Sequence, residues 1–225
     1  SYLKLSLLPE YRLALSGDRS LLFRAGIAWD DSNRDESAAS FLGDVSYRQT
    51  GVGGSSETLY LSFAQSSQVP GYTAIVPGNP LFAGDSGLQR ERSENLELGI
   101  RLERPDWSLD AAVFHRSDDD LVDWTFIAGD PSARSAENVT IDTLGTEWIV
   151  TRRWDKLEAV AGYTYLHKDE QFGNPAVTGS FYALNYPEHR ATLGLLWQPL
   201  PSLEFRIDNE WRTQEANPLR SGSDA

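Results

Sequence analysis

The side chains that could do chemistry are spread along the chain and do not form a recognised catalytic or metal-binding set. The three histidines are His115, His167 and His189. They lie in different predicted hairpins, no helical His-Glu pair is present, and the sequence has no cysteine. These features disfavour a zinc site. The simpler interpretation is that each of the three is a single histidine on a polar face or in a loop, with no metal-binding or catalytic role.

Two short charged runs could bind ions or partners. The Asp118-Asp119-Asp120 run offers the hard oxygen ligands that calcium prefers, but it lacks the spaced ligands and the glycine of an EF-hand. A solvated acidic loop is therefore expected. The Arg152-Arg153-Trp154 turn could contact a partner or an anionic lipid, and an interfacial anchor is the simpler account.

The sequence predicts no enzyme and no cofactor. It contains no Gly-x-Ser-x-Gly elbow, and no Ser, His and Asp set can be chosen by spacing. With 33 acidic residues, any pair of carboxylates chosen for glycoside hydrolysis would be uninformative. The net charge of -13 argues against nucleic-acid binding, which needs Lys and Arg contacts to phosphate.

The elements that must position these residues are β-strands. About ten segments alternate apolar with polar or charged residues, and residues 203–208 and 96–102 are the clearest. Strand side chains point to opposite faces with a period of two, so each segment has one apolar and one polar face. No apolar run approaches the roughly 18 residues of a transmembrane helix.

The connections between these segments are alternately short and long. The predicted hairpins pair residues 3–15 with 21–30, 40–50 with 58–65, 93–103 with 107–116, 139–151 with 157–167, and 188–198 with 202–213. The long connections, called the long-loop rim below, are residues 31–38, 66–92, 117–138 and 168–186. Because successive strands reverse direction, all short turns lie at one end and all long loops at the other. This asymmetry is typical of bacterial outer-membrane barrels.

Alternation alone does not decide which medium each face contacts. In a soluble β-sandwich, the apolar faces would form a core between two sheets and the charged faces would be wet. In a barrel, the charged faces would line a hydrated lumen. Four tryptophans near predicted strand ends, Trp29, Trp107, Trp154 and Trp197, favour the interfacial girdle of a barrel.

Several segments together resemble the C-terminal barrel portion of a TonB-dependent outer-membrane receptor. The segments that carry the resemblance are residues 59–66, 69–72, 92–100, 109–116, 144–147, 161–165 and 186–190. Each motif is short, but their order and spacing cover most of the chain.

The resemblance implies an all-β fold, an antiparallel up-and-down transmembrane β-barrel that is partial here. Residues 1–225 would supply about ten strands of a plugged barrel of about 22 strands, with the N-terminal plug and the closing strands absent. The implied function is energy-coupled uptake of a scarce ligand, such as a ferric siderophore or cobalamin, in the outer membrane of a Gram-negative bacterium. The implied partners are outer-membrane lipid, a small-molecule ligand such as a metal chelate, and an inner-membrane energy-coupling protein that acts through the absent N-terminal region.

Any ligand contacts in this chain are expected at the long-loop rim and the adjacent lumen. The aromatic and cationic candidates are Tyr72, Phe82, Arg90, Arg92, Trp124 and Phe126, since such groups stack on or pair with large ligands. Packing of the loops on themselves is the alternative for each residue. Two other functions remain open from the sequence: a soluble β-sandwich that binds a ligand or adheres, and a small ten-stranded outer-membrane enzyme such as a protease.

Overall fold

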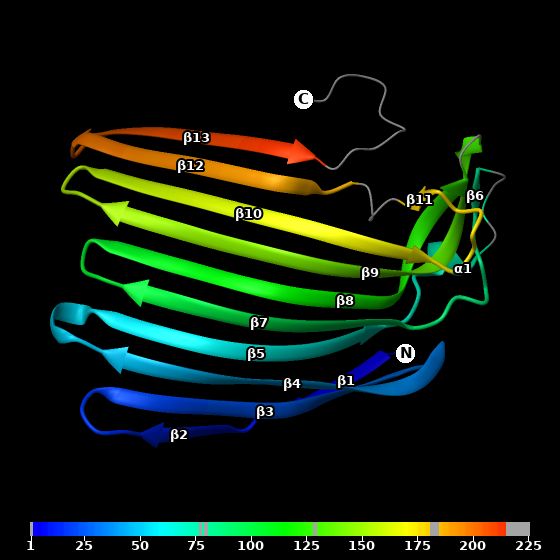
Figure 1. Cartoon of the computed structure of the whole chain (residues 1–225), viewed down its shortest axis with the longest axis horizontal. Helices are drawn as coiled ribbons and strands as arrows, with labels where there is room; N and C mark the ends of the chain where they lie inside the picture. Colours follow the sequence, from blue (N-terminus) through cyan, green and yellow to red (C-terminus); the bar gives the residue numbers. More distant parts are fainter. Residues whose placement is uncertain (1, 77, 79–80, 128–129, 181–184, 215–225) are drawn as a thin grey trace.

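A computed structural model of the chain describes residues 2–76, 78, 81–127, 130–180 and 185–214. They form one 13-stranded sheet, whose main order is β1-β3-β4-β5-β7-β8-β9-β10-β12-β13 (Figure 1). The strands of the main order are β1 (Tyr2–Leu7), β3 (Arg19–Ser32), β4 (Asp35–Thr50), β5 (Ser56–Gln68), β7 (Glu91–Glu103), β8 (Trp107–Ile127), β9 (Asp130–Arg153), β10 (Leu157–Phe172), β12 (Pro187–Leu200) and β13 (Leu203–Gln214). The short elements are β2 (Glu10–Ala14), η1 (Val52–Gly54), α1 (Tyr72–Ile75), β6 (Phe82–Ala83) and β11 (Gly179–Ser180).

The first predicted strand is divided into β1 and β2, which both pair with β3. Pro9 lies between them, and proline cannot donate a ladder hydrogen bond. At this break the chain approaches β3 closely, since a Cβ on Gly26 would lie 2.2 Å from the carbonyl oxygen of Leu7. Glycine at this position lets the edge strand be interrupted without leaving the sheet.

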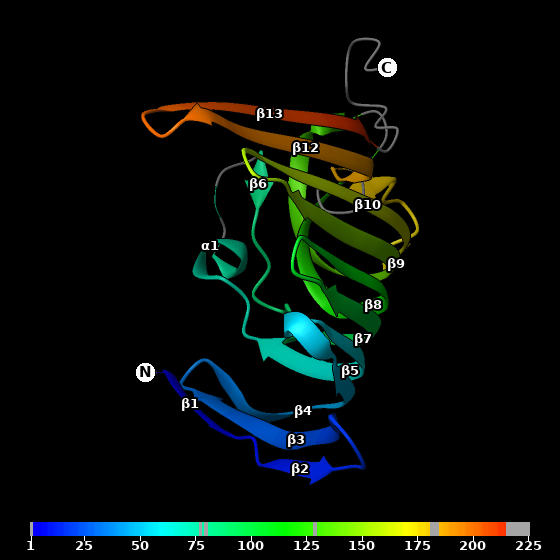
Figure 2. The ribbon, with the colours of Figure 1, turned by 90° about the vertical axis from the view of Figure 1, so that its left-hand side faces the viewer.

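The strands of the main order pair antiparallel and form a curved wall (Figure 2). Among the described residues, no pairing joins β1 or β2 to β13, so this part of the sheet is open. The predicted antiparallel, partial barrel is confirmed. None of the described helices is long and apolar enough to cross a bilayer.

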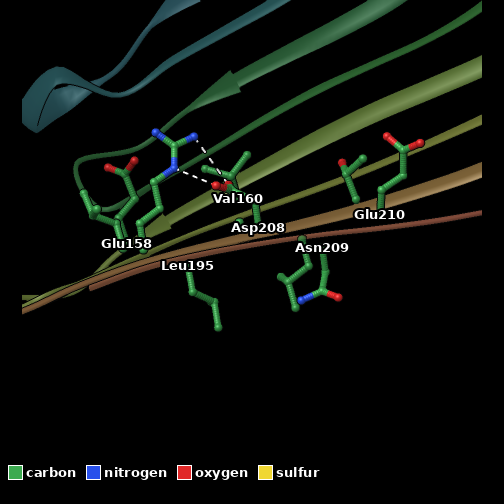
Figure 3. A pocket seen from close by; sticks show the side chains of 11 residues that line it. Glu158, Val160, Leu195, Asp208, Asn209 and Glu210 are labelled. Carbon is green, nitrogen blue, oxygen red and sulfur yellow. Dashed lines mark hydrogen bonds and ion pairs between the residues drawn. The ribbon is translucent and has the colours of Figure 1, made fainter. Parts of the chain in front are cut away.

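The apolar face of the wall is exposed. Leu61 and Leu98 are cross-strand neighbours, and they are 44% and 47% exposed. Figure 3 shows the two faces at β12 and β13, where Leu195 points to one side of the ribbon and Asp208 to the other. The β-sandwich alternative is therefore wrong for the described residues, because their strands form one sheet with no second sheet over the apolar rows.

The predicted short turns are confirmed, and the long connections are more ordered than predicted. The expected loop at 117–138 is wrong: β8 and β9 continue through most of it as a paired hairpin. β10 likewise extends to Phe172. β3 and β4 remain paired as far as Ser32 and Asp35, so most of the predicted loop at 31–38 is part of this hairpin. For β8 and β9 the reason is tertiary, because β6 pairs parallel with β9 and β11 pairs with β8, which adds partners for this extension.

The best-packed part of the molecule lies at this same end. Val139 and Ile141 form a small buried cluster, and Leu121 and Phe172 pack against it. Phe126 is 4% exposed. Among the described residues, a small core thus lies at and next to the long-loop rim, whereas the apolar face of the wall has no such cluster.

Candidate functional site

The β8–β9 hairpin is bent where its pairing becomes irregular. The register shifts between Asp118 and Leu121. Asp120 has a φ of 54°, in the left-handed region that aspartate tolerates better than most residues. Such a bulge bends a strand and increases its twist. Beyond the bulge, the hairpin turns toward α1 and β6 (Figure 1).

The bulge is fixed by a hydrogen-bonded carboxylate. Asp118 is buried and accepts hydrogen bonds from Arg116 Nε at 2.9 Å, from Arg116 Nη2 at 2.8 Å and from the Ser93 hydroxyl at 2.6 Å. The prediction that the acidic run is a solvated loop is therefore wrong for Asp118. Its partners lie on β7 and β8, so the carboxylate joins two strands at the base of the extension.

Beyond the bulge, three of the predicted ligand residues lie on neighbouring elements. The rings of Phe82 and Trp124 meet edge to face, with centroids 5.5 Å apart. Phe126 is two residues further along β8, and the guanidinium of Arg134 on β9 lies 5.3 Å from its ring centroid. Phe82, Trp124 and Phe126 are called the aromatic group below. Phe126 is buried within the rim, whereas Phe82 is exposed and Trp124 half-buried.

Arg90 holds three segments together. It is 8% exposed, its Nε donates to Asp35 at 3.0 Å, and its Nη1 pairs with Asp30. Its Nη2 donates to the carbonyl of Glu36, and Ser67 Oγ lies 3.3 Å from Nη1. Burial acts to lower the pKa of Arg90, but hydrogen bonds to Asp30 and Asp35 raise it above its ordinary value. The guanidinium therefore stays charged, and its donors are engaged within the protein.

The segment that carries Arg90 is also attached to the bent hairpin. The N–H of Gln89 donates to Asn138 Oδ1 at 2.7 Å. Asn138 Nδ2 in turn donates to the carbonyl of Asp120. Asn138 and Asp30 thus position the rim, although neither was a predicted site residue. No local sequence signal identifies them, because Gln89 is 49 residues from Asn138 and Arg90 is 60 residues from Asp30.

The other two predicted residues lie apart from the aromatic group. Tyr72 begins α1 and is 69% exposed. Arg92 lies on β7 and lines a pocket between the β3–β4 hairpin and the segment that leads into β7. The structure therefore brings Phe82, Trp124 and Phe126 together and places Arg90 and Arg92 near a separate pocket. Ligand contact by the six residues stays a prediction.

The described residues do not form a metal centre. No group of three or more His, Cys, Asp or Glu side chains is placed to hold an ion in this part of the chain. His115 lies 3.5 Å from Asp142, and His189 Nδ1 lies 2.8 Å from the hydroxyl of Tyr163.

The charged face of the wall carries paired side chains and two shallow pockets. Arg24 donates to Asp44 at 2.6 Å, and a pocket of about 390 Å³ lies over this pair. A second pocket, of about 510 Å³, lies at β10, β12 and β13. The dashed lines in Figure 3 mark Arg206 paired with Asp208 at 2.8 Å in this pocket. The charges largely neutralise one another, so this face is hydrophilic without a single dominant sign.

Comparison with known protein families identifies the family of this chain. A family model described as TonB dependent receptor-like, beta-barrel, matches residues 9–223. The chain belongs to the TonB-dependent receptor family. A search of curated protein sequences gave no match.

Solved structures of siderophore receptors and of a copper transporter share the fold. The siderophore receptor PirA from Acinetobacter baumannii superposes with a TM-score of 0.62 at 18% identity, covering 98% of this chain and 36% of PirA. The copper transporter OprC gives 0.61 at 15% identity, with coverages of 96% and 36%. The alcaligin outer-membrane receptor FauA from Bordetella pertussis gives 0.56 at 17% identity, with coverages of 95% and 38%. The chain spans a little over a third of the length of these proteins.

Proposed function

We propose that this chain is part of the wall of an outer-membrane receptor of a Gram-negative bacterium that takes up a small-molecule ligand such as a metal chelate. The observation that carries the proposal is the exposed apolar face of a single antiparallel sheet with all its short turns at one end. Apolar surface this extensive marks a membrane or protein contact. The hydrocarbon core of a bilayer would cover the apolar side chains of all the strands at once.

The height of the apolar rows agrees with a bilayer. On β7, the apolar row runs from Leu96 to Leu102, and the next residues on the same face are Glu94 and Arg104. The interval between these two charged residues is about ten residues, which is the length of a tilted strand that spans the hydrocarbon core. Trp107 and Trp154 lie at the short-turn end, where a lower aromatic girdle belongs.

The charged face would then line the lumen, and the long-loop rim would face outward to receive the ligand. Phe82, Trp124 and Tyr72 supply accessible surfaces for stacking, and Arg92 supplies a cation. PirA is a siderophore receptor, FauA is an alcaligin receptor and OprC is a copper transporter. A chelate is favoured over a free ion here, because recognition by aromatic rings and single cations needs an organic ligand. No enzymatic role is proposed.

We further propose that residues 1–225 act with parts of the receptor outside this chain. An N-terminal plug would fill the lumen and contact an inner-membrane energy-coupling protein, and additional strands would pair with the free edges of β1, β2 and β13. An edge without a partner is not tolerated in lipid. This proposal agrees with the fraction of the related structures that the chain covers.

The test is uptake by cells that carry the full-length gene. We expect deletion to abolish growth on one iron or copper chelate of a panel, and plasmid-borne wild type to restore it. Trp124→Ala should raise the chelate concentration that gives half-maximal uptake by about fivefold, since loss of one stacking contact costs about 1 kcal/mol. Trp211→Ala is the matched control, because Trp211 is an exposed tryptophan on β13 outside the rim. Unchanged growth of the deletion strain on every chelate would contradict the proposal.

A further inference from the structure

The wall divides between β4 and β5 at the long-loop rim. Their pairing ends at Leu42 and Ala64. β4 nevertheless continues alongside β3 to Asp35, and β5 continues alongside β7 to Gln68. The two strands therefore diverge, as the β3–β4 hairpin does from β5 in Figure 1. A pocket of about 1140 Å³ lies in the divide.

Side chains, in place of a β-ladder, bridge the divide. The side chain of Gln65 accepts the N–H of Phe41 at 3.0 Å and donates to Glu94 at 2.6 Å. Arg90 joins the hairpin to β5 through Asp30 and Ser67. These bridges fix the width of the opening, so the pocket is a built feature of the wall.

The lining of this pocket is rich in neutral groups that both donate and accept hydrogen bonds. They include Ser37, Ser40, Ser66, Ser86, Gln65 and Gln89. Charged lining residues of both signs are present, including Arg34, Arg92 and Glu36. A lining of this kind does not select a phosphate, which needs an excess of cations. The described residues also lack a group that could hold a free metal ion.

One aromatic ring lies among these polar groups. Phe41 lines the pocket and is 56% exposed. Phe41 is the cross-strand partner of Ile27, so its side chain lies on the apolar face. On β5 and β7, the last apolar pair of this face is Phe63 with Leu96. The next pair on the same face is Gln65 with Glu94, which is polar. The pocket thus lies where the apolar rows end and polar side chains begin.

We propose that this pocket binds a saccharide. Sugar hydroxyls donate and accept, as the serine and glutamine side chains do, and the C–H face of a pyranose can pack on the exposed ring of Phe41. The volume of about 1140 Å³ exceeds the range of about 300–1,000 Å³ that is usual for small-molecule sites, so it is large enough for more than one sugar ring. The saccharide can be the headgroup of an outer-leaflet glycolipid or a free oligosaccharide, because both present the same chemistry. Only the glycolipid source depends on the proposed membrane placement.

The test uses the full-length receptor purified in a mild detergent and studied by native mass spectrometry. The two probes are a glycolipid, lipid A bearing two core sugars, and the lipid-free core oligosaccharide obtained by acid hydrolysis of lipopolysaccharide. We expect an adduct with at least one probe. Phe41→Ala should lower its abundance about tenfold, and Ser37→Trp, which fills the pocket, should remove it. Phe23→Ala is the matched control, since Phe23 is an exposed phenylalanine on β3 that does not line the pocket.

The outcomes separate this proposal from the proposed function. An adduct with the glycolipid alone, or with the free oligosaccharide as well, supports the site and identifies the source. Absence of an adduct with both probes, or equal loss in Phe41→Ala and Phe23→Ala, overturns it. Chelate uptake measured on the same variants is independent. Uptake without saccharide binding would refute only this site, and saccharide binding without uptake would refute only the import function.

Discussion

Gly99 and Tyr60 provide a sharp test of packing on the charged face. They are cross-strand neighbours, and the ring of Tyr60 lies directly over Gly99. A Cβ on Gly99 would lie 2.3 Å from both Cζ and the hydroxyl oxygen of Tyr60. In Gly99→Ala the ring must therefore move. It would then lose its hydrogen bond to Glu97, at 2.7 Å, and its contact with Arg101, whose guanidinium lies 5.0 Å from the ring centroid.

The two lost interactions set the expected cost. A hydrogen bond to a charged group contributes about 1.5–3 kcal/mol, and an exposed cation–π contact contributes about 0.5–1 kcal/mol. We therefore expect Gly99→Ala to lower the free energy of unfolding by about 2–4 kcal/mol. The assay is urea unfolding of the full-length receptor refolded into lipid vesicles, followed by tryptophan fluorescence. Gly173→Ala is the control, because nothing lies within 4 Å of a Cβ at Gly173.

A double-mutant cycle isolates the contact. With Tyr60→Ala already present, the methyl group at residue 99 meets no ring, and Gly99→Ala should cost less than about 0.5 kcal/mol. A full-length receptor in which Gly99→Ala is neutral would refute the packing described above. A cost that persists without the Tyr60 ring would show that the backbone, and not the ring, requires glycine.

Two further predictions concern the rim. Arg90→Met leaves the buried carboxylate of Asp30 without its cation, which should lower the free energy of unfolding by about 3–5 kcal/mol. Hydrogen exchange should show lost protection over residues 30–41. The control is Arg206→Met, which removes an exposed ion pair and should change no protection. Burial, together with the nearby charge of Asp118, raises the pKa of Glu91 above its ordinary value of 4.5. The folded state therefore binds this proton more tightly than the unfolded state, and the free energy of unfolding falls as the pH rises from the unfolded-state pKa through the folded-state pKa. Glu91→Gln should therefore be more stable than the wild type at pH 7 in urea unfolding, and a gain that is equally large well below pH 4.5 would exclude this cause.

The strands of the wall could be predicted from the sequence because their signals are local. The alternation at 96–102 and the short Arg104-Pro105-Asp106 turn sufficed to place β7 and the start of β8, and both are confirmed. Period-two patterning and turn residues act within a few positions of the chain. They report which residues share a face without naming the medium outside it. The structure adds that Leu61 and Leu98 are exposed on a single sheet, which excludes a second sheet packed over that face in the described part of the chain.

The rim could not be predicted because its order depends on distant partners. Residues 117–138 have the acidic, glycine- and proline-containing composition of a loop, yet Trp124 pairs with Ala136 and β11 pairs with β8. Strand formation follows such tertiary context more than intrinsic preference. Arg90 shows the same limit. Its charge made it a candidate ligand group, and only the fold shows that Asp30, 60 positions away, engages that charge.

The central claim is that the apolar face of this wall contacts lipid and the charged face contacts water. The chain has no cysteine, so single cysteines can be placed cleanly within it in a full-length receptor whose other cysteines are replaced. A fluorophore attached at Leu61→Cys or Leu98→Cys should be quenched by brominated lipid. In unlabelled samples, the free thiol at the same positions should not react with an aqueous thiol reagent in outer membranes. Ser62→Cys and Glu97→Cys should show the reverse. Aqueous labelling of the two leucine positions together with lipid quenching at residues 62 and 97 would contradict the claim.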